Sequence, residues 1–172
     1  MHLIVRPETE EDHAAISEIN ELAFGQKNEG ELIERLRKTE HFIPELSLVA
    51  VSGDRRVGHI LFYPVLIRDG KEPHASLALA PIAVHPDCQR KGVGVRLVQE
   101  GISVAKQLGY NSVVVVGHPE YYPMFGFKPA SKWDIKAPFE VPDEAFLALE
   151  LNDGALKDVS GTVEYPEEFN DI

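Results

Sequence analysis

The N-terminal part of the chain predicts two amphipathic helices, because its apolar residues recur at helical spacing. These apolar residues are Ile16, Ile19, Leu22 and Ala23 in the first helix and Leu32, Ile33 and Leu36 in the second. Thr9, with Asp12 three residues later, predicts where the first helix begins, and Gly25 predicts where it ends. We expect Asn28 to begin the second helix and residues 2–6 to form a short strand ahead of both.

The middle of the chain changes to a pattern typical of β-strands. Residues 46–52, 57–67 and 75–84 are strand-like segments, and turn residues separate them at 53–54 and 68–70. Strands joined by such short turns pair with their neighbours in the sequence. The three segments therefore predict an antiparallel meander.

Beyond the meander, the pattern predicts a long helix and then a buried strand. The helix runs from Gly92 to about Leu108, with Leu108 on its inner face, and Gly109 ends it. Residues 113–116 are an uninterrupted run of valines, which is typical of a strand buried on both faces. Further strands are expected at Ile135, 145–151 and 162–165. The sum is an α/β (α+β) fold, a mixed, mostly antiparallel sheet flanked by helices, with one parallel crossover.

Composition narrows the function classes. The chain has 172 residues, which suits a single domain spanning residues 1–172, and its net charge of −11 argues against a nucleic-acid partner. No apolar run approaches the roughly 18 to 20 residues that cross a bilayer, so we expect no membrane partner. The single Cys88 excludes an internal disulfide, and the seven histidines show no metal-ligand spacing, so we expect no metal. A reduced, cytoplasmic protein is the simplest interpretation.

The strongest chemical signal is a turn between the third meander strand and the long helix. Its residues are Gln89, Arg90, Lys91, Gly92, Val93, Gly94 and Val95. Free backbone N–H groups at the start of a helix, together with the positive end of its dipole, make an anion site. Gly92 and Gly94 let the backbone approach a pyrophosphate without an intervening Cβ, and Arg90 and Lys91 add positive charge.

Two common nucleotide motifs do not fit this turn. A P-loop needs Gly-x-x-x-x-Gly-Lys-Ser/Thr, which is absent. A Rossmann fingerprint needs a third glycine where this chain has Leu97, and it opens the first βα unit of a fold, whereas this turn follows a meander. The turn therefore indicates another phosphate-bearing ligand.

Gln89, Gly92 and Gly94 resemble the Gln/Arg-x-x-Gly-x-Gly/Ala motif of the GCN5-related N-acetyltransferases (GNAT). The likeness extends to the order of elements over most of the chain, and so implies the GNAT-type acyl-CoA N-acyltransferase fold. It implies that acetyl-CoA is the cosubstrate and that the turn holds its pyrophosphate. It also implies that the strand before the turn splays from its neighbour, so that Ile82, Ala83 and Val84 pair with the pantetheine arm.

A Gly-His-Pro-Glu-Tyr-Tyr segment after the buried strand resembles a branch of predicted acetyltransferases of this family. In many family members, a Tyr four residues before the glycine of a Gly-Phe pair lies near the CoA sulfur. Tyr122 has that spacing from Gly126, and a phenol could protonate the departing thiolate. Tyr121 is adjacent and stays an alternative acid.

The base that removes the amine proton is left open. Many family members carry a Glu on the strand before the turn, but residues 77–80 of this chain are Leu-Ala-Leu-Ala. The remaining candidates are His118, Glu120, His59 and the pair Glu29 and Glu31. Each also has a structural explanation, such as capping of a helix or packing in a strand.

The resulting hypothesis is an N-acetyltransferase that moves an acetyl group from acetyl-CoA to a primary amine by direct attack in a ternary complex. The acceptor is a small-molecule or peptide amine that the sequence does not identify, and a homodimer stays open. Because the strand carboxylate is missing, a non-catalytic acyl-CoA-binding or sensory module is the alternative. A purely structural interaction domain that binds no CoA is a third.

Overall fold

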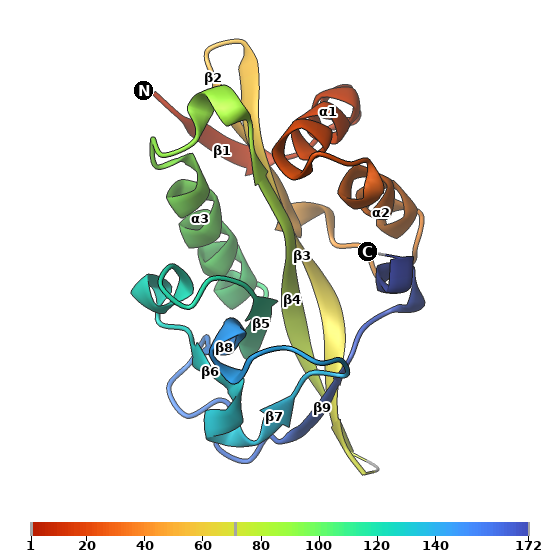
Figure 1. Ribbon diagram of the computed structural model, residues 1–172, viewed down its shortest axis with the longest axis vertical. Coiled ribbons are helices and arrows are strands. Elements are labelled where there is room, and N and C mark those ends of the chain that lie inside the picture. The colour runs from red at the N-terminus through yellow and green to blue at the C-terminus, as the bar shows by residue number, and fades with distance from the viewer. Residues whose placement is uncertain (1, 71, 172) are drawn as a thin grey trace. The chain divides into compact units, whose positions relative to one another are not determined.

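The computed structural model describes residues 2–70 and 72–171, which hold three α-helices and nine strands (Figure 1). In chain order they are β1 (Ile4–Pro7), α1 (His13–Phe24), α2 (Asn28–Arg37), β2 (Ser47–Ser52), β3 (Arg55–Asp69), β4 (Glu72–Val84), α3 (Val93–Gln107), β5 (Ser112–Val116), β6 (Lys128–Pro129), β7 (Ile135–Lys136), β8 (Phe146–Glu150) and β9 (Gly161–Glu164). Short 3-10 helices fill several connections. The sheet is mixed and mostly antiparallel, as expected.

The chain divides into two compact units. The first unit contains residues 1–63, 80–104 and 167–172, and the second contains residues 64–79 and 105–166. Strands β3 and β4 and helix α3 each contribute residues to both units. The single domain expected from the chain length stays a prediction.

The first unit is a layered arrangement of strands and helices. Strand β2 pairs antiparallel with β1 and with β3. Helices α1 and α2 lie side by side on one face of these strands, and α3 lies on the other face (Figure 1). Alternation along β3 explains how both faces are filled. Leu61 and Tyr63 pack with α1 and α2 residues, whereas Gly58 and Phe62 face α3.

The second unit contains the parallel crossover. Leu77 and Ala78 of β4 pair in parallel with β5, and β5 pairs antiparallel with β8. Strand β6 pairs with β8, while β9 pairs with β3 and β7. A buried hydrogen bond joins the hydroxyls of Ser76 and Ser112 at 2.7 Å. Apolar residues of β3, β5, β8 and β9 form the core of this unit.

The sequence pattern locates most elements and fails at their ends. Gly25 ends α1 with a left-handed φ of 72°, as predicted, and its N–H donates to the Glu21 carbonyl at 2.9 Å. Leu108 was expected to face inward but is 42% exposed, because α3 ends one residue earlier. Val116 was expected to be buried but is 46% exposed, because it is the last residue of β5.

Candidate functional site

Hydrogen bonds fasten the end of β4 to its surroundings. The His85 N–H donates to the Val57 carbonyl of β3 at 2.8 Å, and the Cys88 N–H donates to the His85 carbonyl at 2.8 Å. The Gln89 side chain folds back, and its Nε2 donates to the Val84 carbonyl at 3.2 Å. The motif glutamine therefore helps to close the turn that leads away from the strand.

Asp87 brings a carboxylate into this turn, and Arg55 pairs with it. Arg55 Nη2 lies 3.1 Å from Asp87 Oδ2, and the Asp87 N–H donates to Nδ1 of His85 at 3.1 Å. An unpaired carboxylate here would repel a phosphate. With Asp87 paired, the positive charges of Arg90 and Lys91 dominate this part of the turn.

The backbone of the turn is shaped for close approach. Arg90 and Gly92 have left-handed φ angles of 64° and 85°, which a glycine adopts freely and an arginine rarely. A Cβ added at Gly92 would meet nothing within 4 Å, so the space beside it is open. The Arg96 N–H donates to the Gly92 carbonyl at 3.1 Å. The N–H groups ahead of it have no carbonyl four residues earlier within α3, and such groups suit an anion.

Exposure follows the expected division between ligand-facing and core-facing residues. Gln89, Arg90, Lys91 and Gly92 are exposed, Gly94 and Val95 are half-buried, and Val93 is buried. The exposed residues carry the charges and the open backbone, while Val93 anchors the helix. The side chains of Gln89, Arg90 and Lys91 can therefore be changed with little loss of core packing.

Gly58 lets the start of α3 pack tightly onto β3 and β4. A Cβ at Gly58 would lie 3.0 Å from Leu97 Cδ1, 3.0 Å from Val93 Cγ1 and 3.2 Å from the Ala83 carbonyl oxygen. Val93 and Leu97 are fully buried on this face of the helix. The position of the helix start, and of the turn ahead of it, is thus set by close packing in the first unit.

The last residues of β4 leave the parallel pairing. Among the described residues, β4 pairs with β5 only through Leu77 and Ala78, although β4 continues to Val84. Pro81 has no backbone N–H and cannot donate to a neighbouring strand. Residues 82–84 therefore lie beyond the pairing, which is the arrangement implied for a strand that binds a pantetheine arm.

The aromatic ring of Tyr122 is enclosed by other aromatic rings of the second unit. Tyr122 is 6% exposed and begins a 3-10 helix that ends at Phe125. Its ring centroid lies 5.1 Å from that of Tyr121 and 5.6 Å from that of Phe127, both in edge-to-face geometry. Burial raises the pKa of Tyr122 to about 12, so the phenol is protonated at neutral pH. Within the described residues, its hydroxyl makes no hydrogen bond.

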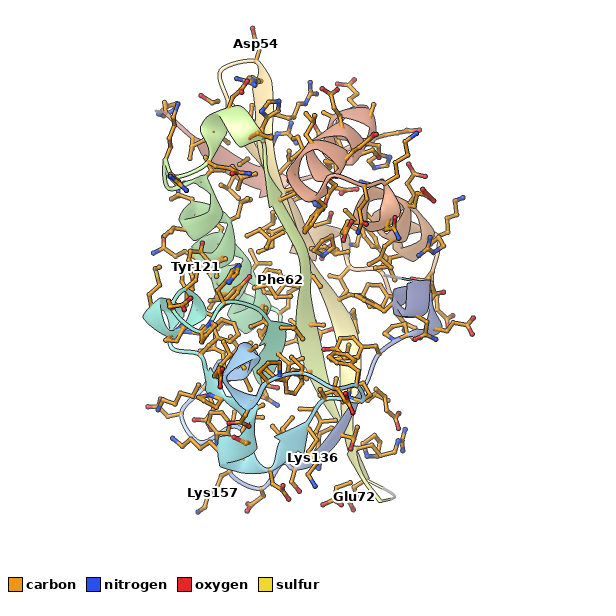
Figure 2. All side chains as sticks on the ribbon, in the orientation of Figure 1. Asp54, Phe62, Glu72, Tyr121, Lys136 and Lys157 are labelled. Carbon is orange, nitrogen blue, oxygen red and sulfur yellow. The ribbon has the colours of Figure 1, made fainter. Side chains whose placement is uncertain are left out.

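The other predicted acid and base candidates near Tyr122 are more accessible. Tyr121, labelled in Figure 2, is half-buried, and burial raises the pKa of its phenol. His118 and Glu120 are exposed. The His118 carbonyl accepts from the Tyr121 N–H at 3.1 Å, so this residue shapes the turn through its backbone.

Two of the base candidates in the first unit, His59 and Glu29, have structural partners, and the third, Glu31, lines a pocket. His59 is 0% exposed, and its Nε2 lies 2.8 Å from Ser47 Oγ and 3.3 Å from Glu8 Oε1. Glu29 accepts two hydrogen bonds from Gln26 Nε2, each at 3.0 Å. Glu31 is one of the residues that line an open pocket of about 200 Å³ between α1 and α2. The pocket residues are Ser17, Glu21, Lys27, Gly30, Glu31 and Glu34.

A buried ionic cluster around Glu8 was not anticipated from the sequence. The Glu8 carboxylate accepts from Arg37 Nε at 2.7 Å, from Arg37 Nη2 at 3.1 Å and from the Ser47 hydroxyl. His13 Nε2 lies 2.9 Å from the same carboxylate. Burial would raise the pKa of Glu8, but its hydrogen bonds to His59, Arg37 and Ser47 prevail and lower it to about 2.

A second buried carboxylate, Asp12, is paired in the same manner. Arg6 donates to both of its oxygens, at 2.7 Å and 3.0 Å, and Arg56 Nε donates at 2.8 Å. The Thr9 N–H donates to Asp12 Oδ2 at 2.7 Å, which is half of the capping arrangement predicted from the sequence. These bonds, that of Arg6 foremost, hold the pKa of Asp12 well below its usual range. We interpret both acids as structural, because side-chain and backbone donors of the chain itself already occupy their carboxylate oxygens.

Two further properties of the described residues bear on the site. No group of three or more His, Cys, Asp or Glu residues among them could hold a metal ion. None of the helices in the described ranges is long and apolar enough to cross a membrane.

The fold, in which β4 leads through a glycine turn into α3, matches solved structures of the GNAT family, and this match defines the class of protein. The chain belongs to the acetyltransferase (GNAT) family, whose sequence profile matches residues 14–127, more than half of the chain.

Three similar proteins support this assignment. YjhQ of Escherichia coli K12, an uncharacterised N-acetyltransferase, is 38% identical over 134 residues, 77% of this chain and 74% of YjhQ. YhbS of the same strain, also uncharacterised, is 32% identical over 169 residues, 98% of this chain and 99% of YhbS. Crystal structures of Escherichia coli YhbS with CoA and of a Brucella melitensis GNAT acetyltransferase with acetyl-CoA are each 31% identical to this chain. Their TM-scores are 0.91, covering 99% of this chain and 93% of YhbS, and 0.79, covering 98% of both chains.

Proposed function

We propose that this protein transfers an acetyl group from acetyl-CoA to a primary amine. The observation that carries the proposal is the turn before α3, where the open space at Gly92 and the unpaired N–H groups of a helix start suit a pyrophosphate. The CoA and acetyl-CoA complexes of the two similar crystal structures support the same ligand. The cytoplasmic location belongs to the same proposal.

The first unit supplies the cofactor-binding residues in this proposal. The backbone N–H groups of residues 89–95 bind the pyrophosphate, and Arg90 and Lys91 attract it. Residues 82–84 offer the peptide groups of β4 to the pantetheine arm. The buried side chains of Val93 and Leu97 hold the helix start in place.

Tyr122 of the second unit is the proposed acid. The neutral amine attacks the thioester carbonyl and forms a tetrahedral intermediate, and its nitrogen then gives a proton to a base. As the intermediate collapses, the C–S bond breaks and its electron pair goes to sulfur. The Tyr122 hydroxyl proton moves to that sulfur to give the CoA thiol, and the phenolate takes a proton from water. Because its pKa is raised, the Tyr122 phenol carries its proton at neutral pH.

The base and the acceptor are less narrowly defined. His118 and Glu120 are exposed and can pass protons to solvent, whereas His59 is sealed in the Glu8 cluster and is a poor candidate. The charge of −11 favours a cationic acceptor through electrostatic steering, and the acceptor class remains a small-molecule or peptide amine. A homodimer stays a prediction, which a measurement of the molecular mass in solution would test.

Isothermal titration with acetyl-CoA tests the proposal directly. Acetyl-pantetheine, which lacks the pyrophosphate, is the control ligand. We expect binding to acetyl-CoA and a large loss of affinity for the control. If the protein bound neither ligand, acetyl-CoA would not be its cosubstrate and the proposed acetyltransferase activity would fail as well. Binding of acetyl-CoA without transfer to any member of an amine panel would favour the acyl-CoA-binding module. The absence of a carboxylate at residues 77–80 is the observation that supports that alternative.

A further inference from the structure

Gly117, directly after β5, lies against the ring of Tyr122. A Cβ added at Gly117 would lie 2.2 Å from Tyr122 Cε2, 2.8 Å from Cδ2 and 3.2 Å from Cζ. Atoms do not approach so closely, so any side chain at this position must displace the ring or the backbone. The Gly117 N–H donates to the Ala145 carbonyl at 2.9 Å, which holds the backbone in place. The ring is therefore the part that would move.

The position of Tyr122 depends on packing alone. Tyr121 and Phe127 meet its ring edge to face, Gly117 forms a further wall, and within the described residues no hydrogen bond fixes the hydroxyl. A phenol held by a hydrogen bond would tolerate a looser pocket. A phenol held only by its ring depends on every wall, because a shift of the ring carries the hydroxyl with it.

We propose that Gly117 is a positioning residue, which fixes the Tyr122 hydroxyl where it can protonate the leaving thiolate. The inference rests on the proposed role of Tyr122 in acetyl transfer. It assigns Gly117 no contact with acetyl-CoA or the amine. Its effect passes through the ring of Tyr122, and this separates it from a glycine that merely allows the chain to fold.

The chain provides a matched control in the first unit. A Cβ at Gly101 of α3 would lie 2.1 Å from Cε1 and 2.6 Å from Cζ of Phe62, which is labelled in Figure 2. Gly101 and Gly117 thus face an aromatic ring at the same close distance. Phe62 has no hydroxyl and no proposed chemistry. Gly101→Ala therefore reports the cost of the steric clash by itself.

The experiment measures kcat and KM for acetyl-CoA in Gly117→Ala, Tyr122→Phe and the double variant, with Gly101→Ala beside them. Circular dichroism and urea unfolding establish the folded fraction of each. We expect Gly117→Ala to lower kcat by up to about 100-fold with little change in KM, since misplacing a catalytic group by about 1 Å can cost that much. The double variant should have the kcat of Tyr122→Phe, because no hydroxyl is left to misplace. Gly101→Ala should retain the kcat of the unmodified protein per folded molecule.

Three outcomes would overturn the inference. A folded Gly117→Ala with unchanged kcat, while Tyr122→Phe is slow, removes Gly117 and leaves the proposed function intact. Equal losses from Gly117→Ala in both backgrounds show that Gly117 acts without the hydroxyl. Unchanged turnover in Tyr122→Phe removes Tyr122 from the mechanism and Gly117 with it, although acetyl transfer itself stands.

A second variant keeps the test usable if Gly117→Ala does not fold. Phe127→Leu replaces a ring that packs edge to face against Tyr122 with a smaller side chain, so Gly117→Ala combined with Phe127→Leu gives the Tyr122 ring room to shift. Compared with Phe127→Leu alone, this variant should fold and show the same loss of kcat. A folded protein with no loss would contradict the inference.

Discussion

The turn before α3 and the cluster around Glu8 are both polar regions of the first unit, yet their hydrogen bonding differs. In the turn, N–H groups at the helix start lack helix partners, and Gly92 borders open space. In the cluster, Arg37, Ser47, His13 and His59 all contact one buried carboxylate, that of Glu8.

This difference separates function from stability. Buried polar groups must be paired, because an unpaired one costs the free energy of its lost hydration. Exposed N–H donors cost little free energy when no ligand is bound, because water forms hydrogen bonds with them. Changes in the turn should therefore affect acetyl-CoA binding with little effect on folding, and changes in the cluster should do the reverse.

The largest expected effect is at Gly92. Gly92→Val should lower acetyl-CoA affinity by about 100-fold or more, since losing even two charge-assisted hydrogen bonds of about 1.5 kcal/mol each has that effect. Gly109→Val is the matched control, because Gly109 lies two residues after the same helix, with a φ of 88° and equally open space beside it. Both variants force an L-residue into a left-handed conformation, at about 1–2 kcal/mol. Equal acetyl-CoA affinity in the two variants, measured by titration, would show that the turn does not bind the ligand.

The next effect concerns Glu8. Glu8→Gln should lower the free energy of unfolding by about 3 kcal/mol, because it leaves Arg37 buried without its charge partner. Glu164→Gln breaks the exposed pair with Arg68 and should cost at most about 1 kcal/mol. Urea unfolding measures both, and acetyl-CoA affinity should be unchanged. Similar losses in the two variants would mean that the burial of Glu8 is unimportant.

Acid should weaken the same cluster without a mutation. Burial lowers the pKa of the His59 imidazole below its ordinary value of 6.5. Near pH 6.5, the imidazole is therefore protonated more in the unfolded chain than in the folded protein. The free energy of unfolding should fall as the pH drops through 6.5. The pKa of Glu8 is lowered from 4.5 to about 2, so its contribution is present above pH 4.5 and is lost between there and pH 2. Urea midpoints should be nearly constant from pH 8 to about pH 7 and should fall from there to pH 3, less steeply below pH 5 in Glu8→Gln. A flat profile would contradict this.

The smallest effect is expected at Arg55. Arg55→Ala removes the arginine partner of the exposed Asp87 carboxylate in the turn and should raise KM for acetyl-CoA by about threefold, since exposed pairs contribute at most about 1 kcal/mol. Lys136→Ala removes the charge partner of Asp134 elsewhere on the surface and serves as the control. A KM that is identical in both variants would assign the pairing of Asp87 no role in binding.

The sequence predicted regions whose signal is local and missed those assembled from distant residues. The turn, the parallel crossover at residues 113–116 and the end of α1 at Gly25 each follow from a short stretch of sequence. The Glu8 cluster joins Glu8, which directly follows β1, to residues of α1, α2, β2 and β3, and nothing in the sequence around Glu8 predicts it. The sequence around Gly117 does not indicate its contact with the ring of Tyr122, which only the structure shows.

The make-up of the first unit has a consequence during synthesis on the ribosome. The ring of Tyr63 meets that of Phe169 at 6.0 Å, and Phe169 packs against the core formed by α1 and α2. These helices leave the ribosome early, whereas Phe169 emerges only after the whole second unit has been made. Part of the early apolar surface must stay uncovered meanwhile, and nascent chains in that state are targets for chaperones.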